Sequence, residues 1–140
     1  MEIVAAVFVE SFNMRAVAGP STRIDLTGVF FSMAAPSPAP VTVEPHLLAL
    51  ISCGPDEPGN GIFEVVFRRG PSEDDEKVAR NVSPFTVDPG RFTYRLVRGE
   101  LEFADNGPVV AHCRIDRGPV HQVPFTLLPP VEPAPGGPGV

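Results

Sequence analysis

Proline and glycine are spread along the whole chain, and their spacing is the strongest constraint on its fold. The 140 residues include 18 prolines and 13 glycines, which divide the sequence into apolar runs that rarely reach the length of a helix. Proline removes a backbone donor and glycine weakens a helix, so short runs separated in this way favour strands joined by turns. The sequence therefore predicts an all-β chain.

Strands are expected over several of these runs. Glu2 to Phe12 is rich in β-branched and aromatic residues, and a turn-rich stretch over 13–21 follows it. The run from Thr22 to Phe31 is the second expected strand, and the three prolines between Ser32 and Pro40 predict an extended surface connection. Leu47 to Ile51 is continuously apolar, which is typical of a central strand covered on both faces, with a short helix as the alternative.

Alternation defines the later strands. Phe63, Val65 and Phe67 should face a core, while Glu64 and Arg68 should point to water. The segment from Val78 to Val87 contains Pro84 and is predicted to be at best a weak edge strand. The remaining assignments are a strand with Phe92, Tyr94 and Leu96 on one face, followed by Leu101 and Phe103, and a closing hairpin of 109–115 and 120–128 around the turn Asp116-Arg117-Gly118.

Seven or eight short strands without an amphipathic helix indicate a two-layer antiparallel β-sandwich with an immunoglobulin-like layout. A small β-barrel is the alternative, because periodicity does not separate the two. The chain has no Trp, and its two cysteines, Cys53 and Cys113, are not expected to pair, which excludes a true immunoglobulin domain. We expect one domain over residues 1–128 and a disordered, Pro/Gly-rich tail over 129–140.

The charge balance narrows the possible partners. Eleven basic residues stand against seventeen acidic ones, the formal charge is -6 and the pI is about 4.9, which argues against nucleic acid. The apolar start is interrupted by Glu10 and has Glu2 where an export signal carries basic residues, and no apolar run is long enough to span a bilayer. The expectation is a cytoplasmic protein without membrane contact, whose thiols are reduced and buried.

Several segments resemble a family of small bacterial, actinobacterial-like proteins of unknown function. They are the opening strand Glu2 to Phe12, the segment Leu26-Thr27-Gly28-Val29-Phe30, and the closing Ile115-Asp116-Arg117-Gly118 followed by Val123-Pro124-Phe125. The likeness covers about residues 2 to 128, and ten arginines against the single Lys77 suit a GC-rich bacterial genome. The resemblance implies a β-sandwich and a cytoplasmic setting, and it implies no activity.

The closing hairpin holds two of the three histidines. Cross-strand neighbours lie close enough to share a metal, but alternation places His112 and His121 on opposite faces of the sheet, so we expect no metal site there. Cys113 and His121 share a face, and a thiol beside an imidazole can be a nucleophile. A structural thiol packed beside a partly buried histidine is the interpretation we prefer, and His46 has no identifiable partner.

The other charged groups give no reaction centre. The acidic run Glu73 to Glu76, even with Asp56 and Glu57, lacks the alternating ligands of a calcium loop, so a solvated loop is expected. No GxSxG, GxGxxG or Walker pattern occurs. Five arginines gather in the C-terminal part, where they are expected to face solvent, with a local anion or partner site as the alternative: Arg91, Arg95, Arg98, Arg114 and Arg117. No catalytic, cofactor-binding or metal-binding residue is predicted, and no cofactor.

The functional hypothesis is therefore a non-catalytic binding or assembly module. A structural subunit of a larger bacterial assembly is the alternative, and an enzyme that uses a perturbed Cys113 thiol is the minor one. The expected partner is a protein or a second copy, reached by strand addition at the strand Glu2 to Phe12 if that strand lies at a sheet edge. Nothing in the sequence identifies a small-molecule ligand.

Overall fold

The computed structural model describes residues 1–19 and 22–131, and these residues contain strands and no helix. Eleven strands are formed within them, three more than the largest number expected. They are β1 (Glu2–Ala16), β2 (Thr22–Phe30), β3 (Ser32–Ala34), β4 (Val41–Val43), β5 (His46–Ser52), β6 (Asn60–Arg68), β7 (Lys77–Thr86), β8 (Phe92–Arg98), β9 (Leu101–Phe103), β10 (Gly107–Ile115) and β11 (His121–Leu128).

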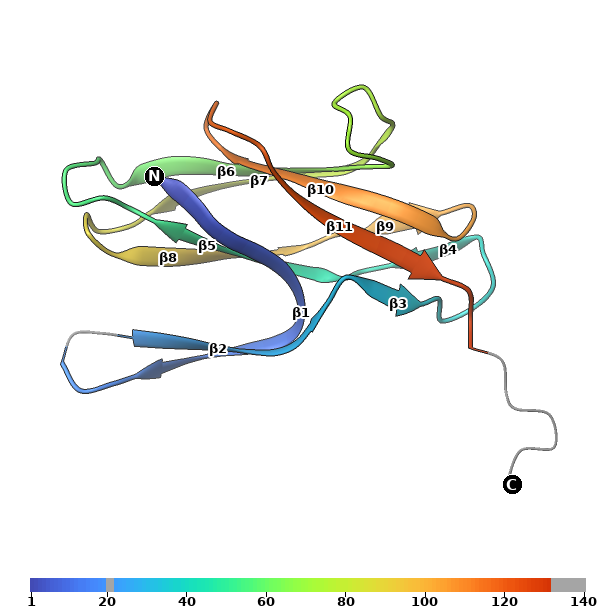
Figure 1. Cartoon of the computed structure of the whole chain (residues 1–140), viewed down its shortest axis with the longest axis horizontal. Coiled ribbons are helices and arrows are strands. Elements are labelled where there is room, and N and C mark those ends of the chain that lie inside the picture. The colour runs from blue at the N-terminus through green and yellow to red at the C-terminus, as the bar shows by residue number, and fades with distance from the viewer. Residues whose placement is uncertain (20–21, 132–140) are drawn as a thin grey trace.

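Two main sheets pack face to face, with a short β4-β9 ribbon beside them (Figure 1). Sheet A has the order β2-β1-β5-β8 and sheet B has the order β3-β11-β10-β6-β7. Every pair is antiparallel except β3 with β11. The fold is a β-sandwich with no closed barrel, as the sequence predicts, and the order β11-β10-β6-β7 matches the G-F-C-C′ order of variable-type immunoglobulin sheets.

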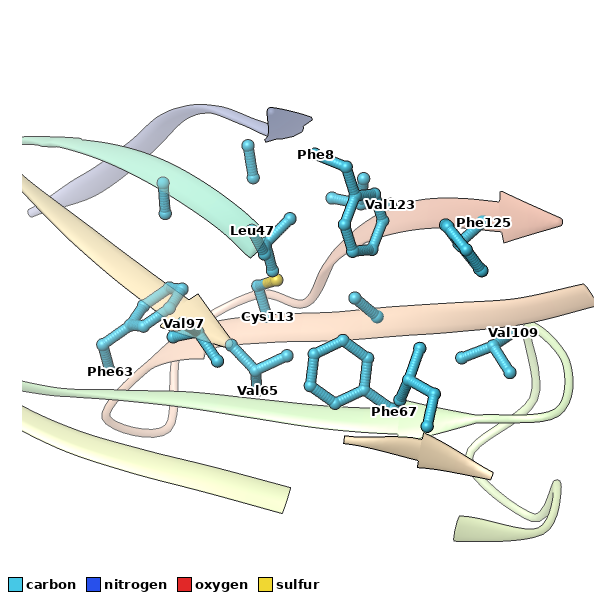
Figure 2. Packing of buried hydrophobic residues seen from close by; sticks show 14 of the residues in the cluster. Phe8, Leu47, Phe63, Val65, Phe67, Val97, Val109, Cys113, Val123 and Phe125 are labelled. Carbon is cyan, nitrogen blue, oxygen red and sulfur yellow. The ribbon is translucent and has the colours of Figure 1, made fainter. Parts of the chain in front are cut away.

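The main core lies between the two sheets and is formed by alternate residues of each strand. Phe63, Val65 and Phe67 are fully buried there, so the predicted inward face of β6 is confirmed. Val109, Cys113, Val123 and Phe125 enter from the closing hairpin, and Phe8, Leu47 and Val97 enter from sheet A (Figure 2).

The strand β5 is buried on both of its faces. Leu47, Ala49 and Ile51 belong to the main core, whereas Leu48 points the other way and is nevertheless 0% exposed. The prediction of a central strand covered on both faces is confirmed, and the short helix is wrong. A second cover must therefore lie on the far side of sheet A.

Strands differ from the expectation at two places: β1 continues through the expected turn to Ala16, and Ser32–Ala34 adds a short strand beside β11. β7 is an edge strand, as expected for the segment that contains Pro84. Proline is tolerated in β7 because this strand is the edge of sheet B.

The strand β11 ends at Leu128. Of the tail expected over 129–140, residues 132–140 lie outside the described residues. Within the described part of the chain, no helix has the length and apolar character needed to cross a membrane.

Candidate functional site

The closing hairpin separates its two histidines as predicted. Cys113 is the cross-strand partner of His121, and His112 is the partner of Gln122, so the imidazoles lie on opposite faces of sheet B. His112 is 5% exposed, and its Nε2 donates to the Gly70 carbonyl at 2.9 Å while Nδ1 has no partner. This histidine fixes the loop over 69–76 to the outer face of sheet B.

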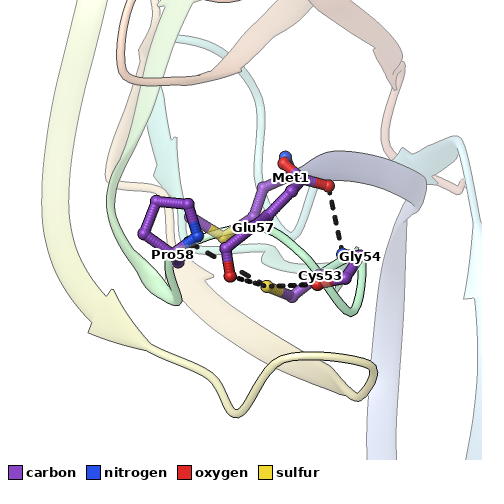
Figure 3. Close-up of polar contacts among 5 residues, drawn as sticks. All are labelled: Met1, Cys53, Gly54, Glu57 and Pro58. Atoms are coloured by element: carbon purple, nitrogen blue, oxygen red, sulfur yellow. Dashed lines mark hydrogen bonds and ion pairs between the residues drawn. The ribbon is translucent and has the colours of Figure 1, made fainter.

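The cysteines are free and buried. Burial raises the pKa of the Cys113 thiol to about 12, so it stays protonated at neutral pH and is a poor nucleophile. The Cys53 thiol lies 3.5 Å from the Gly54 carbonyl oxygen and 3.6 Å from that of Glu57, in a tight loop (Figure 3). Glu57 also accepts from the Gly54 amide and binds the Met1 ammonium group, which ties the start of β1 to this loop.

The acidic residues do not converge on one site. Glu73 and Asp74 are exposed in the loop over 69–76, where Asp75 accepts from the Ser72 amide at 2.8 Å. Glu57 lies in a different loop, beside Met1. No group of three or more potential metal ligands occurs within residues 1–19 and 22–131.

Arg114, Arg98 and Arg95 also lie at different places in the fold. Arg114 joins Arg80 in binding Glu64 on the outer face of sheet B, at 3.0 Å and 2.7 Å. Arg98 lies within 4 Å of Glu44 and Glu100 at the surface. Arg95 departs from the expected solvent-facing position: its guanidinium stacks on the Phe85 ring at 5.3 Å, and its Nε is buried without a partner.

Arg95 points inward because the more apolar face of β8 faces away from the main core. Val97 belongs to the main core, so Arg95 shares the inward face, whereas Tyr94 and Leu96 lie on the outer face of sheet A. Leu96 is 42% exposed. The apolar side of β8 thus faces away from the main core.

A projecting hairpin lies over this outer face. We call it the arm, meaning Glu10–Ala16 of β1 together with β2. In Figure 1 the arm turns back beneath sheet A, on the side opposite sheet B. The turn occurs where the register skips Glu10 and Gly28, and Gly28 has a φ of 66°, a left-handed conformation that favours glycine.

The arm presents an apolar inner face to sheet A. Phe8 points into the main core, but Phe12 contacts Tyr94 of the outer face with ring centroids 5.1 Å apart. Leu26 is the cross-strand partner of Phe12, and Met14 pairs with Ile24 on the same face. This inner face lies against the side of sheet A that carries Tyr94 and Leu48, and it forms a second, smaller apolar layer.

The second apolar layer is incompletely closed. Met14 remains 38% exposed on the arm and Leu96 42% exposed on β8. Within the arm, β2 is the outermost strand of sheet A and pairs only with β1. The arm therefore combines a half-exposed apolar face with an open sheet edge, and it is the candidate functional site.

Strand addition at Glu2 to Phe12 was expected only if that strand lay at a sheet edge, and the edge of sheet A is formed by β2 instead. β1 lies between β2 and β5, and only Glu2 to Val7 lack a neighbour on the β2 side. Two signals in the sequence pointed to the arm: the doubly apolar run of β5 requires a second cover, and Gly28 interrupts an otherwise regular strand.

Comparisons with family models, with curated proteins and with solved structures found no match. The resemblance to small bacterial proteins therefore stays a prediction.

Proposed function

We propose that the chain is a non-catalytic assembly module that binds a protein partner by extension of sheet A at the arm. The observation that carries the proposal is the open edge of β2, a nine-residue strand without proline. An exposed edge offers unpaired amide and carbonyl groups to an incoming strand, and natural proteins normally protect such edges.

The half-exposed inner face of the arm supports the same proposal. An incoming strand beside β2 extends the layer of Phe12, Ile24 and Leu26, so it gains apolar contacts as well as backbone hydrogen bonds. A catalytic role has less support, because burial keeps the Cys113 thiol protonated.

A shortened arm tests the proposal. Phe12 and Leu26 are cross-strand partners, so residues 13–25 can be replaced by Asn-Gly, a two-residue turn that suits such a hairpin. The variant keeps the contact between Phe12 and Tyr94, and we expect a cooperative thermal transition close to that of the full chain because most of the removed side chains are exposed. Self-association in sedimentation and partner retention from extracts of the native host should both be lost.

A variant with Glu73→Ala and Asp74→Ala is the control, since both side chains are exposed on a loop of sheet B away from the arm. It should associate as the full chain does. The proposal is wrong if the full chain is monomeric across the micromolar range and retains nothing that the shortened variant does not also retain.

A further inference from the structure

We infer that the strand added to β2 is β2 of a second copy, in an antiparallel pair centred on Ile24. This inference rests on the proposed function and names its partner. The inference follows from the protection of the other sheet edges, from an arginine on the arm without an ion-pair partner, and from the register that would give this arginine a partner.

The other edges of the two sheets carry features that discourage strand addition. β7 contains Pro84, and β3 has only three residues. β8 carries Arg95 pointing inward, and the first half of β1 has a register irregularity at Val4. Proline, short length, inward-pointing charge and bulges are known protections of edge strands. β2 pairs with β1 without a register shift, although Gly28 interrupts the ladder, and it has nine residues with no proline and no inward-pointing charge.

One cation of the arm, Arg23, has no carboxylate partner among the described residues of its own chain. Arg15 and Arg23 are direct cross-strand partners, which is unfavourable for like charges. Asp25 binds Arg15 at 2.7 Å and 3.3 Å. Arg23 donates a hydrogen bond to the Thr22 carbonyl at 3.2 Å and makes no ion pair with any residue that the structure describes.

A second copy can bring a carboxylate beside Arg23, since Asp25 can accept from an arginine of each copy at once. A two-fold axis perpendicular to the sheet keeps each face of the arm on the same side in both copies, so the pair must be centred on a residue rather than between two residues. Centred on Ile24, the pair places Arg23 of each copy directly opposite Asp25 of the other. A centre at residue 23 or at residue 25 instead opposes two arginines or two aspartates.

The same register is favourable on the apolar side. Ile24 meets its own copy across the axis, and Thr22 lies opposite Leu26 on that face. The inner faces of the two arms then become one continuous strip, while the ion pairs of Arg23 lie on the opposite, exposed face. One register therefore gives apolar contacts on the inner face of the strand pair and ion pairs on its exposed face.

Charge reversal at Arg23 should change the stability of the dimer without reducing the stability of the arm. Within one chain, Arg23→Glu replaces the repulsion with Arg15 by an attraction, so the monomer's melting temperature should be unchanged or slightly higher. Across the dimer it opposes Glu to Asp25 twice, and we expect the dissociation constant measured by sedimentation to rise about 30-fold. An unchanged dissociation constant overturns the inference.

Two further variants test the register itself. Reversing all three charges, with Arg15→Glu, Arg23→Glu and Asp25→Arg, restores every pair with opposite sign and should return the dissociation constant to that of the natural chain. Ile24→Cys should form an intermolecular disulfide on mild oxidation, because directly opposed residues of an antiparallel pair lie within disulfide range. The matched control Thr27→Cys lies away from the axis and should cross-link poorly. The inference is overturned if the triple reversal does not restore dimerisation, or if the Ile24→Cys and Thr27→Cys variants cross-link equally.

The inference and the proposed function fail in different ways. If the full chain is monomeric but retains a host protein that the shortened arm does not retain, the second copy is wrong and the assembly function stands. If the full chain dimerises and arm shortening has no effect on dimerisation or on partner retention, both are wrong.

Discussion

Glu64 links three strands on the outer face of sheet B. Its carboxylate accepts from Arg80 Nε at 2.9 Å and Nη2 at 2.7 Å, and from Arg114 Nε at 3.0 Å. The side chain is only 15% exposed. The hydrogen bond from Arg80, and then that from Arg114, hold the pKa of Glu64 below its ordinary value of 4.5, although desolvation acts against them.

We predict that Glu64→Gln lowers the free energy of unfolding by about 1 kcal/mol at neutral pH, after allowance for solvent screening of the surface charges. The pKa is lower in the folded state, so the stabilisation is present above pH 4.5 and is lost as the pH falls through the folded value. Urea unfolding at several pH values should show the two chains converging in acid. Glu73→Gln, at an exposed carboxylate, is the control, and a difference that stays constant with pH would contradict the prediction.

Among the elements, the arm depends on one glycine. Gly28 has a φ of 66°, and a Cβ atom there would clash with Glu10 Oε1. Glu10 is exposed and can move aside, so the lasting cost of a larger residue is the left-handed backbone. The kink that turns the arm toward sheet A is therefore a backbone feature.

Replacement of Gly28 by Ala should destabilise the arm by about 1 kcal/mol while sheet B is unaffected. Native-state hydrogen exchange should show faster exchange for amides of β2 and unchanged protection in β6 and β10. The same change in a Glu10→Ala background removes the side-chain clash. If the effect disappears there, sterics rather than backbone conformation set the arm's position.

Strands whose two faces differ clearly in polarity could be predicted from the sequence. Phe63, Val65 and Phe67 alternate with polar residues, so the inward face of β6 was readable, as was the register of the closing hairpin. In β8 both faces carry large side chains, and alternation alone does not decide which one meets the core. The arm was missed because residues 13–16 have turn-forming character locally, and pairing with β2 overrides that preference.

At the scale of the whole molecule, stability depends on the main core far more than on the second apolar layer. Phe67 is 1% exposed at the centre of the sandwich, whereas Phe92 on the outer face of β8 is 39% exposed. We predict that Phe67→Ala costs about 3 to 5 kcal/mol in urea unfolding and that Phe92→Ala costs less than about 1 kcal/mol. Similar losses for both variants would show that the outer face contributes to the core as much as the interior does.

The contact between β1 and β11 also affects the order of events during synthesis. β11 supplies Val123, Phe125 and Leu127 to the core, and the Phe125 ring lies 5.3 Å from that of Phe8. A ribosome delivers β1 first and β11 last, so the growing chain holds Phe8 without its partner for most of translation. The sandwich closes only after the closing hairpin has emerged, and until then the early strands are the segments that a chaperone would need to shield.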